Sequence, residues 1–400
     1  LISSIFEIAE IGKLNAGGCK RLAFSKEDFL AKKKLINWCK EINLNLTMDN
    51  IGNIFAKYEN TYNSKNKSIG IGSHLDTQPH GGKFDGSYGV LSALEVIRII
   101  KEKKIFLKNP LELIIWSNEE GCKYTPPLMG SLFFTKKINL KQILKQNKSQ
   151  NLLLQKDMKY FEKLKLKNTH NKKLHSFIEI HIEQGPVLEN IKKSIGIVTG
   201  AQGSRGFLLE FIGEDAHSGT TPMNLRKDTV VALSNFIVEF NNESKKLDQD
   251  LKATVGNITT LPGSRNTVAG TSHITIDIRH PNSSILDSME KKIIKILNKI
   301  KKRFNVTFNL ELKYKLPTVD FDKNLISLIK SSCLDLNYSY NEMMSGAGHD
   351  AVSISRLYPS AMIFIPCLKG ISHNEKEFAS NKDMVRGCNL LLETVLKISK

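Results

Sequence analysis

Several features are scarce in this 400-residue sequence, and each absence excludes a class of protein. The longest apolar runs, such as Leu111–Trp116, have the length of a buried strand and fall short of the roughly 18 to 20 residues that span a bilayer. The six cysteines are scattered without CxxC spacing, which favours reduced thiols over a disulfide framework. Glu7 and Glu10 follow Leu1 closely, without the basic segment and small-residue cleavage site of a signal peptide. A cytoplasmic protein without membrane attachment is therefore expected.

Acidic residues are few relative to basic ones: 40 Asp and Glu stand against 58 Lys and Arg, which gives a net charge of +18. A charge of this size can attract nucleic acids or anionic membrane surfaces. The lysines, however, occur together with abundant Asn and Ile, as in 147–151 and 291–302. No basic patch interleaved with aromatic residues is visible. We interpret the excess as compositional drift and expect neither nucleic acid nor membrane as a partner.

The apolar pattern divides the chain into two domains, for which 400 residues are ample. Residues 1–45 have helical spacing, and Ser25, followed by Glu27 and Asp28, predicts a helix through about Lys40. Beyond this region, short apolar runs alternate with helical patterns, which is typical of an α/β domain with a parallel or mixed sheet flanked by helices. The predicted elements are strands at 68–73, 111–117 and 177–182 and helices at 90–103 and 382–398.

A second pattern begins near residue 204. Alternating strands at 207–212 and 274–278, with helices at about 227–243 and 284–303, predict a β-α-β-β-α-β order. That order is typical of a four-stranded, ferredoxin-like α+β domain. The sequence therefore predicts a first domain of residues 1–203 and 317–400, with a smaller domain, 204–316, inserted into it.

Polar side chains follow the apolar run at 69–72. His74 comes at the point where this predicted strand ends, and ligands of open α/β sheets gather at the carboxyl ends of strands. Asp76 is placed to hydrogen-bond an imidazole nitrogen, the usual supporting role beside a metal ligand. Asp85 can supply a carboxylate that bridges two ions. Alternatively, Asp85-Gly86 is merely a turn and His74 an ordinary surface histidine.

Two further strands end in the same way. The run 111–116 leads to Glu119 and Glu120, and neighbouring residues of extended chain point in opposite directions. One carboxylate can then bind a metal while the other takes a proton from water. In the strand at 177–182, His181 lies on a polar face with Glu179 and Glu183, opposite three isoleucines. His373 follows a predicted strand at 362–366.

Six segments in this order closely resemble the hydantoinase/carbamoylase branch of the M20-type di-metal peptidase superfamily. The resemblance extends from 10–12 and 21–23 to His373, and the six segments are 72–89, 118–121, 178–186, 213–223, 346–350 and 370–373. That branch contains N-carbamoyl-L-amino-acid hydrolases, β-ureidopropionases and allantoate amidohydrolases. One departure occurs at 374–377, Asn-Glu-Lys-Glu, where relatives commonly have a proline before the glutamate.

The resemblance implies roles for the residues found above. Two divalent metal ions per subunit would be held by His74, Asp85, Glu120, His181 and His373, with Asp85 as the bridge. Glu119 would be the general base, with a pKa raised by burial. Zinc is the first expectation for the metal, with manganese, cobalt and nickel as alternatives, since a mixed His/carboxylate set accommodates all four.

The resemblance also assigns residues of the inserted domain, which would act as a lid and join two subunits into a homodimer. His217 would reach the active site of the other subunit and stabilise the oxyanion. Asn266 and Arg279 would hold the substrate, and the planar guanidinium of Arg279 suits a carboxylate. In the first domain, Gln184 and His349 match further substrate-contacting positions.

The expected reaction is hydrolysis of the ureido C–N bond of an N-carbamoyl amino acid, a small ureido carboxylate, to amino acid, carbon dioxide and ammonia. Allantoate is the nearest rival substrate because it presents the same two groups. An aminoacylase or dipeptidase is a more distant alternative, against which His217, Asn266 and Arg279 count. A non-catalytic binding protein on the same scaffold is a further alternative, but every expected catalytic position is filled.

Overall fold

The computed structural model describes residues 1–59, 66–170 and 172–399, and these residues divide into two compact units. Unit 1 comprises Leu1–Gly200 and Asp320–Lys400, and unit 2 is the intervening segment Ala201–Val319. Each unit contains its own cluster of buried apolar side chains. Unit 2 is therefore one continuous segment inserted between the two parts of unit 1 in the sequence.

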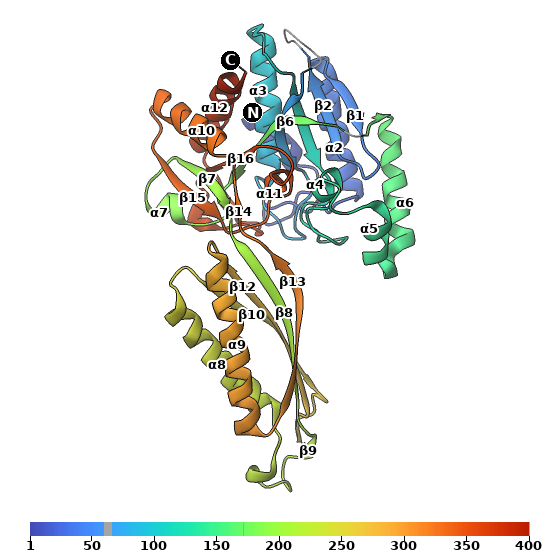
Figure 1. Ribbon diagram of the computed structural model, residues 1–400. Helices are drawn as coiled ribbons and strands as arrows, with labels where there is room; N and C mark the ends of the chain where they lie inside the picture. The colour runs from blue at the N-terminus through green and yellow to red at the C-terminus, as the bar shows by residue number, and fades with distance from the viewer. Residues whose placement is uncertain (60–65, 171, 400) are drawn as a thin grey trace. The chain divides into compact units, whose positions relative to one another are not determined.

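Unit 1 is built on a ten-stranded mixed sheet (Figure 1). Four neighbouring strands run parallel in the order β16, β6, β3, β4, and every residue of β3, β4 and β16 is buried. Burial on both faces explains why these strands are largely apolar and show no regular alternation with polar residues. Antiparallel β7 and β2 flank the four. The strands are β1 Asn45–Met48, β2 Ile54–Tyr58, β3 Ser68–His74, β4 Leu111–Trp116, β5 Lys167–Asn168, β6 Leu174–Ile182, β7 Ile195–Ala201, β14 Val319–Asp320, β15 Tyr340–Ser345 and β16 Ser360–Ile365.

Helices flank this sheet, which confirms the predicted α/β architecture. In one group α12 packs on both α3 and α10, and in another α11 packs on α4. The helix predicted after Ser25 is confirmed as α2. The Ser25 side chain caps its first turn by accepting a hydrogen bond from the Asp28 backbone amide. The helices are α1 Ile2–Ala9, α2 Lys26–Glu41, α3 Ser87–Glu102, α4 Met129–Phe134, α5 Leu140–Gln146, α6 Asn151–Phe161, α7 Val187–Asn190, α10 Lys323–Asp335, α11 Asp350–Ile354 and α12 Asn381–Ile398.

Unit 2 is a four-stranded antiparallel sheet in the order β10, β12, β8, β13, with helices α8 and α9 packed on it. Ile274, Ile276 and Ile278 of β12 are buried among the apolar side chains of these helices. The predicted β-α-β-β-α-β order is confirmed, and a two-stranded sheet of β9 and β11 adds to it. The elements are β8 Gly203–Ile212, β9 Ala216–His217, α8 Thr229–Leu247, β10 Lys252–Leu261, β11 Thr267–Val268, β12 Thr271–His280, α9 Ser283–Phe304 and β13 Thr307–Leu316.

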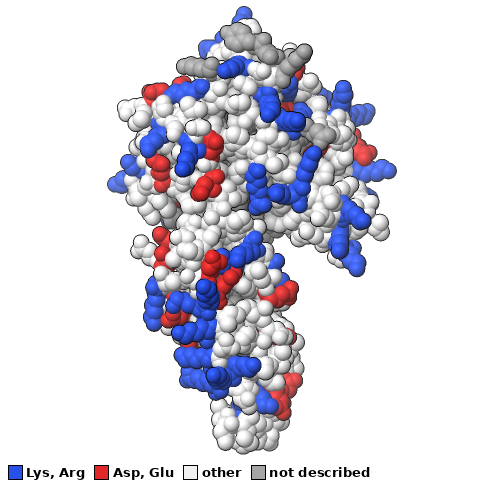
Figure 2. Space-filling view, viewed as in Figure 1, with Lys and Arg blue, Asp and Glu red and all other residues white. Residues whose placement is uncertain are grey.

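The basic residues do not gather on one area of the visible surface. Figure 2 shows Lys and Arg spread over both units with Asp and Glu among them. Some lysines are paired, as in Lys292 Nζ to Glu243, 2.5 Å, and Lys299 Nζ to Glu239, 2.9 Å. Within the described ranges, no helix is long and apolar enough to cross a membrane.

Candidate metal centre

The predicted ligands of unit 1 follow neighbouring parallel strands of one sheet. β3 ends at His74, β4 ends just before the segment that contains Glu120, and His181 lies one residue from the end of β6. His373 follows β16 in the next loop. Because carboxyl ends of parallel strands meet at one edge of a sheet, the fold brings these side chains together.

Asp85 lies at the centre of the cluster. Its Oδ1 is 3.1 Å from His181 Nε2 and 3.5 Å from His74 Nε2, while its Oδ2 is 3.3 Å from His373 Nε2. His373 Nε2 is also 3.5 Å from Glu120 Oε2. The five side chains thus form two groups with Asp85 in common, and the ligand atoms within each group lie within 4.8 Å of one another.

These spacings fit divalent ions. Two ligand atoms about 2.0 to 2.1 Å from one tetrahedral zinc ion lie roughly 3.3 Å apart, close to the separations around Asp85. The imidazoles are also oriented for binding. His74 Nδ1 lies 2.9 Å from the Asp76 carbonyl and His181 Nδ1 lies 2.9 Å from the Ile182 carbonyl. Because a carbonyl oxygen only accepts, each Nδ1 carries the proton and each Nε2 has the lone pair, although His181 Nε2 also accepts from the Gly86 amide at 3.1 Å.

Glu119 and Glu120 occupy different positions, although they are adjacent in the chain. Glu119 Oε2 is 3.5 Å from His74 Nε2, but Glu119 belongs to neither ligand group. Its carboxyl is buried, and burial raises its pKa well above the usual range. Burial, reinforced by Asp85, raises the pKa of Glu120 to about 7. One carboxylate therefore lies among the ligands while its neighbour stays free of them.

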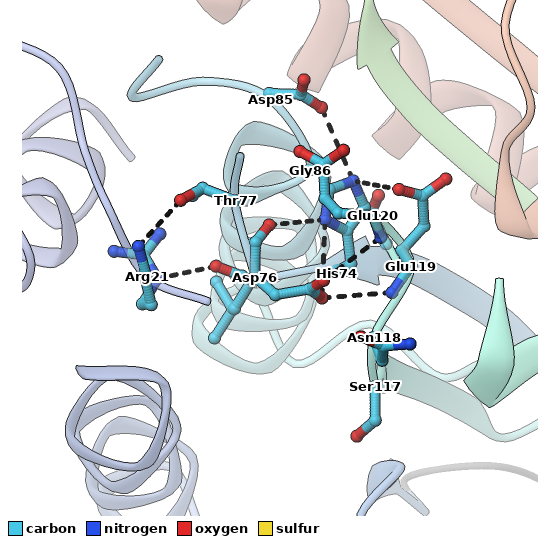
Figure 3. Close-up of polar contacts among 12 residues, drawn as sticks. Arg21, His74, Asp76, Thr77, Asp85, Gly86, Ser117, Asn118, Glu119 and Glu120 are labelled. Atoms are coloured by element: carbon cyan, nitrogen blue, oxygen red, sulfur yellow. Dashed lines mark hydrogen bonds and ion pairs between the residues drawn. The ribbon is translucent and has the colours of Figure 1, made fainter. Parts of the chain in front are cut away.

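Asp76 makes the predicted hydrogen bond to His74, but through its backbone carbonyl and not through its carboxylate. The carboxylate oxygens accept hydrogen bonds from the Glu119 and Glu120 backbone amides at 3.3 and 3.2 Å (Figure 3), and Asp76 Oδ1 lies 3.8 Å from His74 Nδ1. The Asp76 backbone carbonyl is the group that accepts the hydrogen bond from His74 Nδ1. The chain leaves the strand at His74, which directs the Asp76 side chain towards the neighbouring loop. Asp76 therefore orients the two glutamates as well as the histidine.

The substrate-contacting residues predicted in unit 1 both lie at the cluster. Gln184 Nε2 donates to Asp85 Oδ2 at 2.9 Å. His349 is buried, with its ring centre 4.7 Å from that of His181, and burial holds its pKa well below the usual range. Its Nε2 has no hydrogen-bond partner in the described part of the chain. His349 therefore offers a neutral ring nitrogen beside the ligands.

The predicted residues of unit 2 lie in two separate places. His217 is exposed in β9, opposite Thr267 of β11, so Asn266 lies close to it. Arg279 lies near the other end of β12, where its Nε donates to Asp277 at 2.8 Å. Eight residues of extended chain from Thr271 to Arg279 span about 27 Å. Within unit 2, His217 and Asn266 are thus at one end of the sheet and Arg279 is at the other.

Comparison with known proteins identifies the family. The model of the peptidase family M20/M25/M40 matches residues 70–397. The chain belongs to this family. It is 33% identical to an N-carbamoyl-L-amino-acid amidohydrolase of Rhizobium meliloti, covering 100% of this chain and 96% of that one. It is 32% identical to an allantoate amidohydrolase of Bacillus subtilis, covering 98% and 95%.

A solved structure of the same branch superposes on the chain. It is an amidase of the hydantoinase/carbamoylase family from Burkholderia multivorans, with 33% identity and a TM-score of 0.92, covering 100% of this chain and 97% of that one. The resemblance found in the sequence, and the expectation of a hydrolase of the amidohydrolase type, are confirmed.

Sequence reasoning missed a second layer of residues in this M20-family site. Glu377 Oε1 accepts from the Phe84 and Asp85 backbone amides at 3.0 and 3.1 Å, and Ser372 Oγ donates to Glu377 Oε2 at 2.9 Å. Glu377 thereby joins the loop that contains Asp85 to the loop that contains His373. The signal was present at 374–377, where the glutamate remains although the expected proline is absent.

The polar face predicted for the strand of His181 also supports the M20-family site from behind. Glu179 is fully buried and accepts hydrogen bonds from Ser73 Oγ at 2.6 Å and from the Ala351 backbone at 2.8 Å. Glu183 instead caps α7, where it accepts from Val187 at 2.7 Å. Of the three polar residues on that face, only His181 belongs to a ligand group.

Proposed function

We propose that the protein is a two-metal amidohydrolase that cleaves the ureido C–N bond of N-carbamoyl amino acids. The observation that supports this most is the position of Asp85, whose two oxygens face different ligand groups, with Glu119 beside them and outside both. The Rhizobium meliloti relative, an N-carbamoyl-L-amino-acid amidohydrolase, supports the substrate class. The products would be the amino acid, carbon dioxide and ammonia.

The metal ligands in this proposal are those of the two groups. His74 and His181 would share one ion with Asp85, and Glu120 and His373 would share the second with it. When bound, divalent ions supply Lewis-acid chemistry, since they make a water molecule more acidic and polarise a carbonyl group. Zinc is our first choice, and manganese, cobalt and nickel suit the same nitrogen and oxygen donors.

Glu119 is the general base in this proposal. It takes a proton from the attacking water as the water oxygen bonds to the ureido carbon, and it gives that proton to the leaving nitrogen as the C–N bond breaks. Burial, which raises the pKa of this carboxyl, favours such two-way transfer near neutral pH. Its place outside both ligand groups keeps its oxygens available.

The substrate carboxylate would be held by Arg279, whose guanidinium can donate two parallel hydrogen bonds. Asn266, Gln184 and His349 would hold the remaining polar groups. His217 would donate to the oxygen that gains negative charge as the ureido carbon becomes tetrahedral. These assignments extend the family resemblance to this chain.

The positions of His217 and Arg279 support a homodimer joined through unit 2. Because they lie at opposite ends of one sheet, about 27 Å apart along β12, a single copy of unit 2 cannot place both on one small ureido carboxylate. Two copies related by a two-fold axis can each contribute one end. We therefore propose that each active site takes Arg279 from one subunit and His217 from the other.

Allantoate is the second candidate substrate, and the Bacillus subtilis relative favours it. Both candidates combine a ureido group with a carboxylate. The test is ammonia release by metal-loaded enzyme from N-carbamoyl-L-amino acids, N-carbamoyl-β-alanine and allantoate, with an N-acyl amino acid as control. Preferred turnover of the carbamoyl compounds is expected. Preference for allantoate would change the substrate, and release of an acyl acid without ammonia would overturn the proposed reaction.

A further inference from the structure

Arg21 is a buried cation without a buried anion beside it. Its side chain is 0% exposed, and no carboxylate among the described residues pairs with it. A guanidinium remains charged at any ordinary pH, and burying a charge is costly unless hydrogen bonds replace its water. The hydrogen bonds of Arg21 must therefore compensate for its burial.

The guanidinium of Arg21 donates to three segments, two of which lie next to metal ligands. Nη1 donates to the Ile8 and Ile11 carbonyls at 3.1 and 2.9 Å, which anchors the side chain to the amino-terminal segment. Nε donates to the Leu75 carbonyl at 2.6 Å, directly after His74. Nη2 donates to Ser87 Oγ at 2.8 Å, two residues after Asp85. The fork of one side chain therefore joins the segment of the first ligand to the segment of the bridging carboxylate.

The backbone of Arg21 reinforces the first of these contacts. Its amide donates to Thr77 Oγ1 at 2.8 Å, and its carbonyl accepts from the Thr77 amide at 2.9 Å. Figure 3 shows Arg21 beside Thr77 on one side of Asp76, with Glu119 and Glu120 on the other. The loop after β3 is thus held from one side by Arg21, while the Asp76 carboxylate holds the two glutamates on its other side.

The two segments that Arg21 joins are also in direct contact. A Cβ added at Gly86 would come within 2.4 Å of the His74 ring, so the backbone after Asp85 lies against the imidazole. A small shift of either segment would change the 3.5 Å separation of His74 Nε2 and Asp85 Oδ1. The matched family region begins at residue 70, so Arg21 belongs to the part of the chain that precedes it.

We propose that Arg21 is a positioning residue that sets His74 and Asp85 at the separation needed to bind a divalent ion. Removal of a residue that orients ligands typically weakens metal binding about 10- to 100-fold. This inference rests on the metal centre of the proposed function, but not on the identity of the substrate. A merely structural Arg21 would affect stability and leave the affinity of the folded protein for metal unchanged.

The test uses the full chain with Arg21→Lys, which keeps the charge but loses the planar fork. The matched control is Arg205→Lys in unit 2, because Arg205 is also buried but is paired with Asp287 at 2.6 Å and contacts no predicted ligand. Cobalt(II) binding to each apo-protein is followed by absorption and by competition with a chelator, and the thermal midpoint of each apo-protein is measured separately.

Arg21→Lys is expected to bind cobalt about 10- to 100-fold more weakly, with an altered absorption spectrum, whereas Arg205→Lys keeps the wild-type affinity. Wild-type affinity and spectrum in folded Arg21→Lys would overturn the proposal. If Arg21→Lys does not fold, Ser87→Ala, which removes one acceptor of the fork, decides in the same assay: weakened cobalt binding supports the proposal and unchanged binding overturns it. Cobalt binding by wild type without ureido hydrolysis would refute the substrate alone.

Discussion

The adjacent carboxylates Glu119 and Glu120 lie in different surroundings, which suits them to the different roles proposed above. Glu120 accepts from Gln78 Nε2 at 2.6 Å and lies near His373, whereas Glu119 approaches only His74 of the ligand set. The Asp76 carboxylate accepts hydrogen bonds from the backbone amides of both glutamates. Their backbone is thereby fixed, and the two side chains point in different directions from it. At the scale of single residues, this separation is what distinguishes a proposed base from a proposed ligand.

Glu119→Gln is expected to abolish proton transfer without removing a ligand. Turnover should fall about 10²- to 10⁴-fold, the usual contribution of a general base, while two metal ions per subunit remain. Steady-state ammonia release and elemental analysis measure the two quantities.

The matched control is Glu112→Gln, a buried glutamate at the opposite end of β4, paired with Lys172. The turnover of Glu112→Gln should stay within about twofold of wild type, because Glu112 contacts none of the predicted metal ligands. Retained turnover in Glu119→Gln would refute the assignment of the base, and loss of metal would make Glu119 a ligand.

At the scale of elements, the length of β12 decides how unit 2 can take part in catalysis. The strand keeps Arg279 away from the β9–β11 pair, in which His217 accepts from the Gly219 amide at 3.0 Å. A stiff sheet cannot fold these two ends onto one small molecule. The active site proposed above is consequently composite, which makes its subunit origin testable.

His217→Ala and Arg279→Ala are each expected to be nearly inactive alone, and a mixture of the two should recover activity. After random exchange of subunits, half of the dimers are mixed and one of their two sites has both residues, so about a quarter of wild-type activity returns. The measurement is ammonia release before and after subunit exchange, with exchange monitored by mass spectrometry of intact dimers. Full exchange without recovery would place both residues in one subunit's site.

At the scale of the whole molecule, two separate cores share one chain, and all five predicted metal ligands belong to unit 1. A ligand that binds only the folded state stabilises it by mass action. Metal binding should therefore stabilise unit 1 and leave the core of unit 2 without a direct contribution. Both tryptophans of the chain, Trp38 and Trp116, also lie in unit 1.

Metal removal by a chelator is expected to abolish turnover and lower the thermal midpoint seen by tryptophan fluorescence. At a free metal concentration 100 times Kd, each site contributes about 2.7 kcal/mol of stability, which the apo-protein lacks. Far-UV circular dichroism reports the helices and strands of both units. Metal removal should therefore alter a smaller fraction of its thermal transition than of the fluorescence transition. Re-addition of zinc or manganese should restore both properties. An unchanged fluorescence midpoint would contradict a metal centre in unit 1.

Much of the fold was predictable because buried apolar residues recur along the sequence with the period of a helix or a strand. Alternation in β12 identified the buried Ile274, Ile276 and Ile278, and Ser25 marked the start of α2. The contact of the Asp76 carboxylate was not predictable. It depends on the direction in which the chain leaves β3, and no local pattern encodes that direction. Glu377 was overlooked because its two amide partners are almost three hundred residues away.

By itself, the sequence determined which residues end the apolar strands, and hence which side chains are available to bind metal at one sheet edge. Strand periodicity and the family segments are local properties, so they can be recognised without coordinates. The tertiary structure alone set the distances around Asp85, the hydrogen bonds between Asp76 and the two glutamates, and the contacts of Arg21 with Leu75 and Ser87. These contacts join segments that are far apart in the chain. They depend on which strands pair with one another and on the direction in which each turn leads the chain.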